Sequence, residues 1–406
     1  MTSSNLIVKN SIQKNLIKKK LKKKYLSNFQ SIFEEILEEI FEKNKFFNTF
    51  KLNYKFNFRE TDIQKFKKFN KIIFVGMGGS ILGINAIYEF FKKKIKKDIT
   101  FLDDLDIEKI SELKKIKSHQ KILFIIISKS GDTIETITNL LYLDIIKKNA
   151  KNVILISERK NNYLFNLSKK FNLFHVKHEG YIGGRYSVLT ETGILPSMLM
   201  GVNPKKIRKN IDIYFKNKAK KILLKNSSIL VSNILSQRKI NNIILLNYEP
   251  RLEKFLYWLQ QLLAESLGKK NKGFLPVISN APKDHHSLLQ LYLDGPKNNI
   301  FYVFSNGNKS NFSIKKSNLP IDTKFLRGKK LHKIKNAQKN ALINSLKINN
   351  IPYREFTINS LSEETLGELF SFFILETVLL GKLIGVNPFD QPAVEQVKIF
   401  TKFLLK

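Results

Sequence analysis

"ILFIIISKSGDTIETI", residues 122–137, changes character at its middle. Six consecutive apolar residues have the length and composition of a buried strand. A Ser-Lys-Ser-Gly turn follows, and the chain then continues with a pattern typical of a helix. Hydroxyls, a lysine and a glycine between a buried strand and a helix predict a bound anion, because the first amides of the helix point at that turn.

Similar apolar runs lie on both sides of this stretch and alternate with helix-length segments of mixed polarity. Continuous buried strands that alternate with helices are typical of parallel sheets covered on both faces. The sequence therefore predicts an α/β fold with two doubly wound parallel-sheet domains and helical additions at both termini. The runs are "KIIFV" (71–75), "ITFL" (99–102), "KILFIII" (121–127), "NVILI" (152–156) and "LFHV" (173–176), then "NIILLNY" (242–248), "NIFYVF" (299–304) and "YREFTI" (353–358).

The predicted organisation has four parts: a helical N-terminal segment over 1–45, a first α/β domain over 46–204, a second over 205–390 and a C-terminal helix over 391–406. Long helices are expected near 250–268 and 361–384. "FQSIFEEILEEIFEK" predicts a packing helix whose apolar face comprises Phe29, Ile32, Phe33, Ile36, Leu37, Ile40 and Phe41.

Composition excludes several classes of protein. The 406 residues include no cysteine, which excludes a disulfide scaffold and thiolate chemistry. No apolar run is long enough to span a bilayer, and no secretory signal opens the chain. We therefore expect a cytoplasmic protein without a membrane partner.

The formal net charge of +37 has two possible explanations. One is binding to nucleic acid or an anionic membrane. The other is compositional drift, because lysine and asparagine are abundant almost everywhere; the densest run holds six lysines between Lys18 and Lys24. This run could also be a targeting leader, although such leaders favour arginine and serine. No nucleic-acid module accompanies the charge, so we favour drift and expect no nucleic-acid partner.

A glycine-rich turn ends the first predicted strand, in "FVGMGGSILG". A dinucleotide site is the obvious competitor, and Asp103 ends the second strand where a ribose-binding acid belongs. However, a third fingerprint glycine after Gly76 and Gly78 would be residue 81, which is Ile81, and a Walker lysine is absent. Ser80 offers a hydroxyl instead. The remaining alternative is an ordinary glycine turn with a serine cap.

The turn after residues 122–127 repeats this chemistry with Ser128, Ser130, Gly131 and Thr133. Two adjacent strands of a doubly wound sheet that both end in such turns converge on one pocket at the carboxyl edge. Neither turn contains residues expected to bind adenine or pyrophosphate. The pair therefore predicts a site for a single phosphate monoester.

Two further segments carry groups that could do chemistry. In "GGRYSVLTETGILPSML", Arg185 follows two glycines, and its planar fork suits a developing oxyanion, although a surface arginine is the plain alternative. In "WLQQLLAESLGKK", Gln261, Glu265 and Lys269 recur at a spacing of four on one side of a leucine-rich helix. Glu265 could act as a base, or it could form a solvent-facing pair with Lys269.

Two segments near the C-terminus are more ambiguous. "KDHHSLLQLYLDG" contains adjacent histidines, which do not share a helix face, so we expect an acid/base role or a structural one and no metal site. "NPFDQPAVEQVKIFTKFLLK" breaks at Pro388 and Pro392 and restarts as a helix with Glu395 and Lys398 in its first turns. Alone it reads as a packing helix.

Together these segments resemble the phosphoglucose isomerase family. "GMGGSILG", "SKSGDTIET", "GGRYSVLTETGILP", "QQLLAESLGK", "DHHSLLQ" and "QPAVEQVK" occur in the family's order, over residues 71–398. The glycine and serine turns are shared with the wider sugar-isomerase domain group, so the last four segments decide the resemblance.

The resemblance implies a glucose-6-phosphate isomerase of glycolysis and gluconeogenesis. It would interconvert the hexose phosphates through an enediolate, without cofactor or metal, as a homodimer. Glu265 would be the base, Arg185 would stabilise the enediolate, and His286 and Lys398 would assist ring opening. The implied phosphate-binding residues are Ser80, Ser128, Lys129, Ser130 and Thr133, and Gly79, Gln261 and Gln391 match other positions near the substrate.

The chain departs from the family pattern at three points. Asp132 stands where a hydroxyl residue is usual, Ala393 replaces a glycine, and the amino terminus matches poorly. Two alternatives stay open: an isomerase for another sugar phosphate such as mannose 6-phosphate, and a catalytically silent sugar-phosphate sensor with a basic surface for nucleic acid. Glu265, His286 and Lys398 argue against the sensor.

Overall fold

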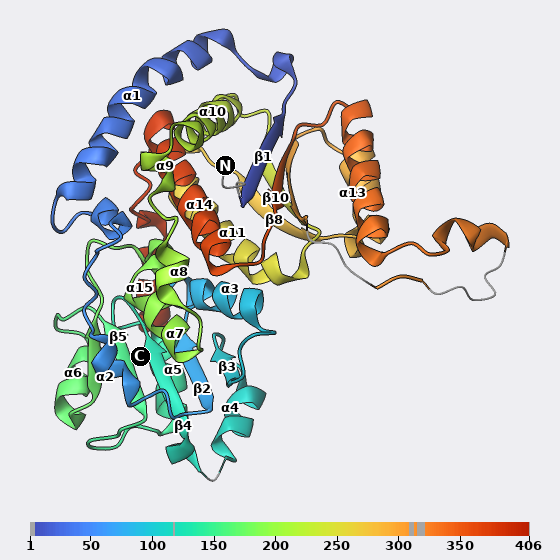
Figure 1. The fold of residues 1–406 in the computed structure, drawn as a ribbon. Coiled ribbons are helices and arrows are strands. Elements are labelled where there is room, and N and C mark those ends of the chain that lie inside the picture. Colours follow the sequence, from blue (N-terminus) through green and yellow to red (C-terminus); the bar gives the residue numbers. More distant parts are fainter. Residues whose placement is uncertain (1–4, 117, 308–311, 315–320, 406) are drawn as a thin grey trace.

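A computed structural model describes residues 5–116, 118–307, 312–314 and 321–405. Figure 1 shows two α/β bodies, the first around β2 and β4 and the second around β8 and β10, with α7 and α8 between them. This confirms the fold class predicted from the sequence. The four domain boundaries stay predictions.

The first sheet is entirely parallel, and its strand order is β3-β2-β4-β5-β6. Because the order reverses between β2 and β4, the turns after these two strands lie at the switch point, where doubly wound sheets bind ligands. The strands are β2 (Lys71–Gly76), β3 (Asp98–Leu102), β4 (Ile122–Ile127), β5 (Val153–Ser157) and β6 (Phe174–Lys177). The helices between and before them are α2 (Glu60–Gln64), α3 (Leu82–Phe91), α4 (Ile107–Lys114), α5 (Ile134–Leu143) and α6 (Tyr163–Phe171).

The second sheet repeats this order in β8-β7-β9-β10 and adds β1 at its edge. Strand β1 is antiparallel to β10, whereas the other neighbours are parallel. The strands are β1 (Leu6–Ser11), β7 (Asn242–Asn247), β8 (Leu275–Asn280), β9 (Asn299–Asn306) and β10 (Tyr353–Ile358). The associated helices are α10 (Lys218–Leu235), α11 (Glu253–Leu267), α12 (Leu289–Asp294), α13 (Leu331–Ile348) and α14 (Glu363–Ile384).

The remaining helices join the two bodies and form the ends of the chain. They are α1 (Lys19–Phe41), α7 (Glu191–Leu199), α8 (Pro204–Arg208), α9 (Ile213–Lys216) and α15 (Glu395–Leu404). No helix in the described part of the chain combines the length and the apolar composition that crossing a bilayer requires.

The N-terminal segment corrects two details of the sequence prediction. It was expected to be helical, but it begins with the strand β1. The packing face of α1 is largely as expected, with Phe29, Phe33 and Ile36 buried, but Phe41 is 76% exposed. Phe41 is the last residue of α1, where the helix no longer lies over the core.

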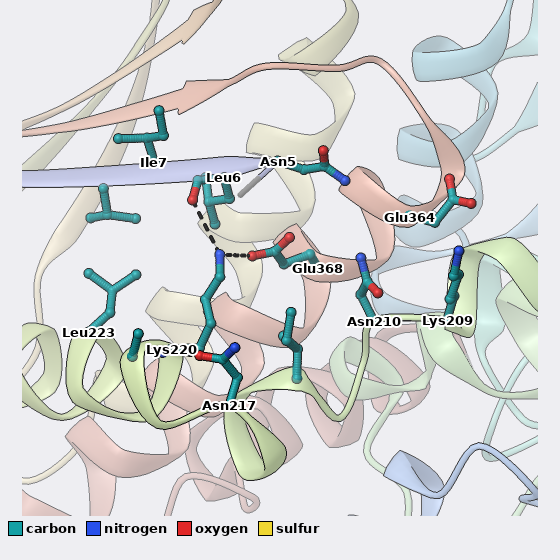
Figure 2. A pocket seen from close by; sticks show the side chains of 13 residues that line it. Asn5, Leu6, Ile7, Lys209, Asn210, Asn217, Lys220, Leu223, Glu364 and Glu368 are labelled. Carbon is teal, nitrogen blue, oxygen red and sulfur yellow. Dashed lines mark hydrogen bonds and ion pairs between the residues drawn. The ribbon is translucent and has the colours of Figure 1, made fainter. Parts of the chain in front are cut away.

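A pocket of about 750 Å³ lies between β1 and helices α10 and α14 (Figure 2). Inside it, Lys220 of α10 forms an ion pair with Glu368 of α14 and donates to the main-chain oxygen of Leu6 at 3.3 Å. Burial strengthens such a pair only when the remaining polar atoms are also satisfied. The contacts tie the added strand to two helices of the second body.

Candidate active site

The turn after β4 is organised by its own hydroxyl groups. Ser128 Oγ is buried, accepts a hydrogen bond from the Gly131 amide at 3.1 Å and is hydrogen-bonded to Thr133 Oγ1 at 2.8 Å. Ser130 is exposed, and the helix α5 begins directly after Thr133. Gly131 has a φ of +74°, which a side chain would disfavour. Ser128 therefore shapes the turn, while Ser130 and the helix start face outward.

Two charged residues of this turn are directed away from its centre. Lys129 Nζ donates to the Gly180 main-chain oxygen at 2.8 Å, and burial lowers the pKa of this lysine. Asp132, which departs from the family pattern, accepts a hydrogen bond from the Tyr163 amide at 2.8 Å, in the first turn of α6. Its negative charge thus stabilises a neighbouring helix N-terminus.

The turn after β2 packs against the segment that carries Arg185. Gly76 pairs with Ile127 in the sheet, so this turn, which includes Ser80, lies beside the turn after β4. A Cβ atom on Gly79 would lie 2.4 Å from the Arg185 main-chain nitrogen, a distance that no structure tolerates. The glycine at 79 is therefore what allows the two segments to meet.

Arg185 is held by a complete set of hydrogen bonds. Its side chain is only 2% exposed, and each of its five N–H groups donates to an oxygen. The prediction of a surface arginine as the plain alternative is therefore wrong. The acceptors are Ser266 Oγ (2.8 Å), Glu265 Oε2 (3.1 Å), Gln391 Oε1 and the main-chain oxygens of Pro388 (2.6 Å) and Asp390 (3.1 Å).

Glu265 remains accessible beside this arginine, with 29% of its side chain exposed. Its second oxygen accepts a hydrogen bond from Gln261 Nε2 at 2.9 Å, one turn earlier on α11. A carboxylate with both oxygens oriented and one side open can exchange a proton with a bound substrate. The alternative pair with Lys269 is wrong: α11 ends at Leu267, and Lys269 Nζ lies 3.1 Å from Asp390 instead.

Three residues that sequence reasoning missed support Arg185. Ser266 accepts from the guanidinium and is hydrogen-bonded to Tyr186 Oη at 2.7 Å. Trp258 Nε1 donates to the Arg185 main-chain oxygen at 3.1 Å. Burial raises the pKa of Tyr186, so its hydroxyl stays protonated and can donate to the Pro388 main-chain oxygen. The only available signal was that Ser266 directly follows Glu265.

The two histidines are in different environments. His285 Nε2 is hydrogen-bonded to Tyr248 Oη at 2.7 Å, and burial lowers its pKa. His286 is exposed on the short 3-10 helix of Lys283–His286, and no described residue pairs with it. His286 is thus the more accessible of the two histidines, and its role in ring opening stays a prediction.

Gln391 and Lys398 lie in different surroundings, and only Gln391 contacts Arg185. Gln391 joins the Arg185 cluster directly, as expected for a residue near the substrate. Lys398 lies on α15, where its Nζ pairs with Glu395 Oε1 at 2.6 Å and is exposed. The chain as described does not bring Lys398 into contact with Arg185 or Glu265, so its role in ring opening stays a prediction.

The groups proposed for competing sites have other partners. Asp103, the candidate ribose ligand, accepts a hydrogen bond from Asn85 Nδ2 at 3.0 Å. Among the described residues, no cluster of three or more histidine and acidic side chains could hold a metal ion. The arrangement at the first switch point therefore combines two turns rich in glycine and hydroxyl groups, an oriented carboxylate and a buried arginine.

Comparison with known proteins identifies the family of this chain. A sequence model described as phosphoglucose isomerase matches residues 46–406. The chain belongs to the phosphoglucose isomerase family. It is 33% identical to a probable glucose-6-phosphate isomerase of Methanococcus maripaludis, over 82% of this chain and 78% of that one. It is 32% identical to the glucose-6-phosphate isomerase of Methanocaldococcus jannaschii, over 86% and 88%.

Solved structures show the same fold as this phosphoglucose isomerase family member. A hypothetical protein of Thermus thermophilus superposes with a TM-score of 0.81 at 23% identity, covering 98% of this chain and all of that one. A glucose-6-phosphate isomerase of Chlamydia trachomatis superposes with a TM-score of 0.70 at 20% identity, covering 85% and 71%. The family model and the relatives confirm the resemblance drawn from six sequence segments.

Proposed function

We propose that this chain interconverts glucose 6-phosphate and fructose 6-phosphate through an enediolate, with Glu265 as the base. The predicted aldose–ketose isomerase activity, in glycolysis and gluconeogenesis, is confirmed by the family and by the names of its relatives. The observation that supports our assignment of roles is the pairing of Glu265 with the buried Arg185, whose main chain packs against the turn after β2.

Isomerisation requires one group that moves a proton and one that stabilises negative charge. Glu265 would remove the proton from C2 of the open-chain aldose and return it to C1. The positive charge of Arg185 would stabilise the enediolate electrostatically, since all five of its N–H groups already donate to protein oxygens. Because these bonds fix the guanidinium, little reorganisation would accompany the charge development.

The phosphate would lie at the first switch point. Ser80, Ser130 and Thr133 would donate hydroxyl hydrogen bonds, while Ser128 holds the turn and the start of α5 supplies its positive end. Lys129 would contribute long-range positive charge. Binding energy from the phosphate can then be used to orient the reacting carbons, which lie several bonds away.

We further propose that the protein is a cytoplasmic homodimer in which His286 reaches the site of the partner. The exposed position of His286 supports this. The helix α15 supports it too, because none of its residues is buried. The exposed fractions of its apolar residues Val397, Phe400 and Phe403 are 67%, 55% and 73%. Large apolar side chains on one helix favour coverage by a second copy. Lys398 on the same helix would then be repositioned towards the sugar ring.

The central test is an assay of purified protein with glucose 6-phosphate, together with the variant Glu265→Gln. We expect turnover by the unmodified chain and a loss of about 10²–10⁴-fold in kcat for the variant, because the amide cannot accept the proton. Glu253→Gln is the matched control, since it makes the same change at the other end of α11. Near-normal turnover by Glu265→Gln would overturn the assignment of the base.

The same assay distinguishes the alternatives. Turnover of mannose 6-phosphate without turnover of glucose 6-phosphate would show that the enzyme is an isomerase for another sugar phosphate. Binding of glucose 6-phosphate without any turnover would identify a sensor.

A further inference from the structure

The second sheet has a switch point of its own, and a pocket lies there. Because β8-β7-β9-β10 repeats the order of the first sheet, the ends of β7 and β9 are neighbours, as those of β2 and β4 are. The pocket has a volume of about 500 Å³, within the range of small-molecule sites. Its lining includes Arg251 after β7, Ser305 and Asn306 at the end of β9, and Lys335 on α13.

The charges in this pocket are unbalanced. Arg251 and Lys335 are half-buried, and in the described ranges of the chain neither side chain has a hydrogen-bond or ion-pair partner. In the pocket of Figure 2, by contrast, the positive charge of Lys220 is matched by Glu368. Two unmatched cations that share a concave site repel one another, and a bound anion would relieve that repulsion.

Glu249, the acidic residue of the pocket, offsets one of the two positive charges but forms no ion pair with Arg251 or Lys335, so the three side chains keep a net charge of +1 (two cations and one anion). Glu249 Oε2 accepts from Asn306 Nδ2 at 2.9 Å, and Oε1 accepts from the Arg251 amide at 3.3 Å. The carboxylate is buried and links the ends of β7 and β9. Glu249 therefore has a structural role in the pocket, and the guanidinium of Arg251 stays available to a ligand.

We propose that this second switch point binds a small phosphate monoester, at a site separate from the isomerase centre. The planar fork of Arg251 matches two phosphate oxygens, and Lys335 adds a point charge. Ser305 and Asn336 offer partners for hydroxyl groups on the rest of the ligand. The pocket also touches Tyr248, whose hydroxyl holds His285, so the site adjoins the segment that carries His286.

The test counts phosphate sites by equilibrium dialysis with radiolabelled inorganic phosphate. The background is Ser128→Ala with Thr133→Val, which weakens the first phosphate site. We expect this protein still to bind phosphate, and the addition of Arg251→Gln and Lys335→Gln to weaken that binding by about tenfold or more. Arg251→Lys should bind with intermediate affinity, because it keeps the charge and loses the fork.

The matched control is Lys333→Gln with Lys347→Gln. It also removes two positive charges, both from α13, the helix that carries Lys335, but at positions outside the pocket. Equal weakening in control and test variants would show a general field effect and overturn the proposal. So would undiminished binding by the test variant, with its fold verified by circular dichroism and thermal unfolding. A change in dimer dissociation or in oligouridylate binding, with phosphate affinity unaltered, would assign the pocket to a second copy or to RNA.

Discussion

At the scale of single residues, the site depends on how Arg185 is held. Sequence reasoning could select Arg185, Glu265 and Gln391 because their motifs resemble a family. It could not select Ser266 or Tyr186, because a hydroxyl next to apolar positions gives no periodic signal and its partner is distant in sequence. The buried contact between Ser266 and the guanidinium exists only once α11 packs against the Arg185 segment.

We expect Ser266→Ala to lower kcat by about 10–100-fold with little change in KM. The variant leaves the buried Arg185 Nε without its acceptor, and a hydrogen bond to a charged group contributes roughly 1.5–3 kcal/mol. Steady-state kinetics with fructose 6-phosphate, together with the affinity for inorganic phosphate, would check this.

The matched control for that experiment is Ser228→Ala. Ser228 is likewise a buried serine on a helix, but its hydroxyl lacks a partner among the described residues. Equal kinetic losses in both variants would indicate a general packing effect and not the positioning of Arg185.

At the scale of elements, the sequence predicted eight of the strands and missed β1 and β8. Strand β8 contains Pro276, which argues against a central strand, and its position at the edge of the sheet explains why the proline is tolerated. Strand β1 is as long as β2 and β4, but its last three residues are polar and a lysine-rich run follows it. Its pairing with β10 depends on residues about 350 positions away, which no local pattern encodes.

A buried ion pair links five elements of the second body. Arg354 on β10 contacts Glu376 of α14 at 2.7 Å and Tyr302 Oη of β9 at 2.7 Å, and it also reaches Ser227 of α10 and Asn10 of β1. All the partners lie around one fully buried guanidinium. The pair fixes the position of the helices against the sheet.

We expect Glu376→Leu to lower the free energy of unfolding by about 3–5 kcal/mol, because it leaves the Arg354 charge buried and unmatched. Adding Arg354→Met should restore a large part of that loss, since a buried pair replaced by apolar groups is often neutral. Urea denaturation followed by circular dichroism measures both. A double variant as unstable as Glu376→Leu alone would contradict this account.

At the scale of the whole molecule, sequence reasoning was limited because the pattern of residues does not show how the elements are arranged in space. The charge of +37 is visible in the sequence, but its distribution over two sheets and many helices is not. The apolar residues of α15 looked like an ordinary packing face. In the structure that face is exposed, which the apolar pattern alone did not predict.

We expect Glu265→Gln and His286→Ala proteins, each nearly inactive, to regain activity when refolded together. If His286 serves the site of the partner, one pocket of a mixed dimer carries both lesions and the other carries neither. Activity should then reach up to half the normal value per mixed dimer. The measurement is an isomerase assay on mixed dimers isolated by means of two different affinity tags.

If His286 instead serves its own subunit, every pocket of that mixed dimer carries one lesion and mixing restores nothing. That result would reject the shared site and leave the isomerase assignment unchanged.

The pairing of β1 with β10 has a consequence for synthesis on the ribosome. Leu6 is made long before Ile358, its partner in the sheet, because Ile358 lies about 350 positions further along the chain. The first sheet, which ends at Lys177, can form much earlier, because domains fold as units while the chain grows. Strand β1 must therefore stay unpaired until β10 has been made. If translation stops before β10, the released chain can form the first sheet, but its strand β1 has no partner strand.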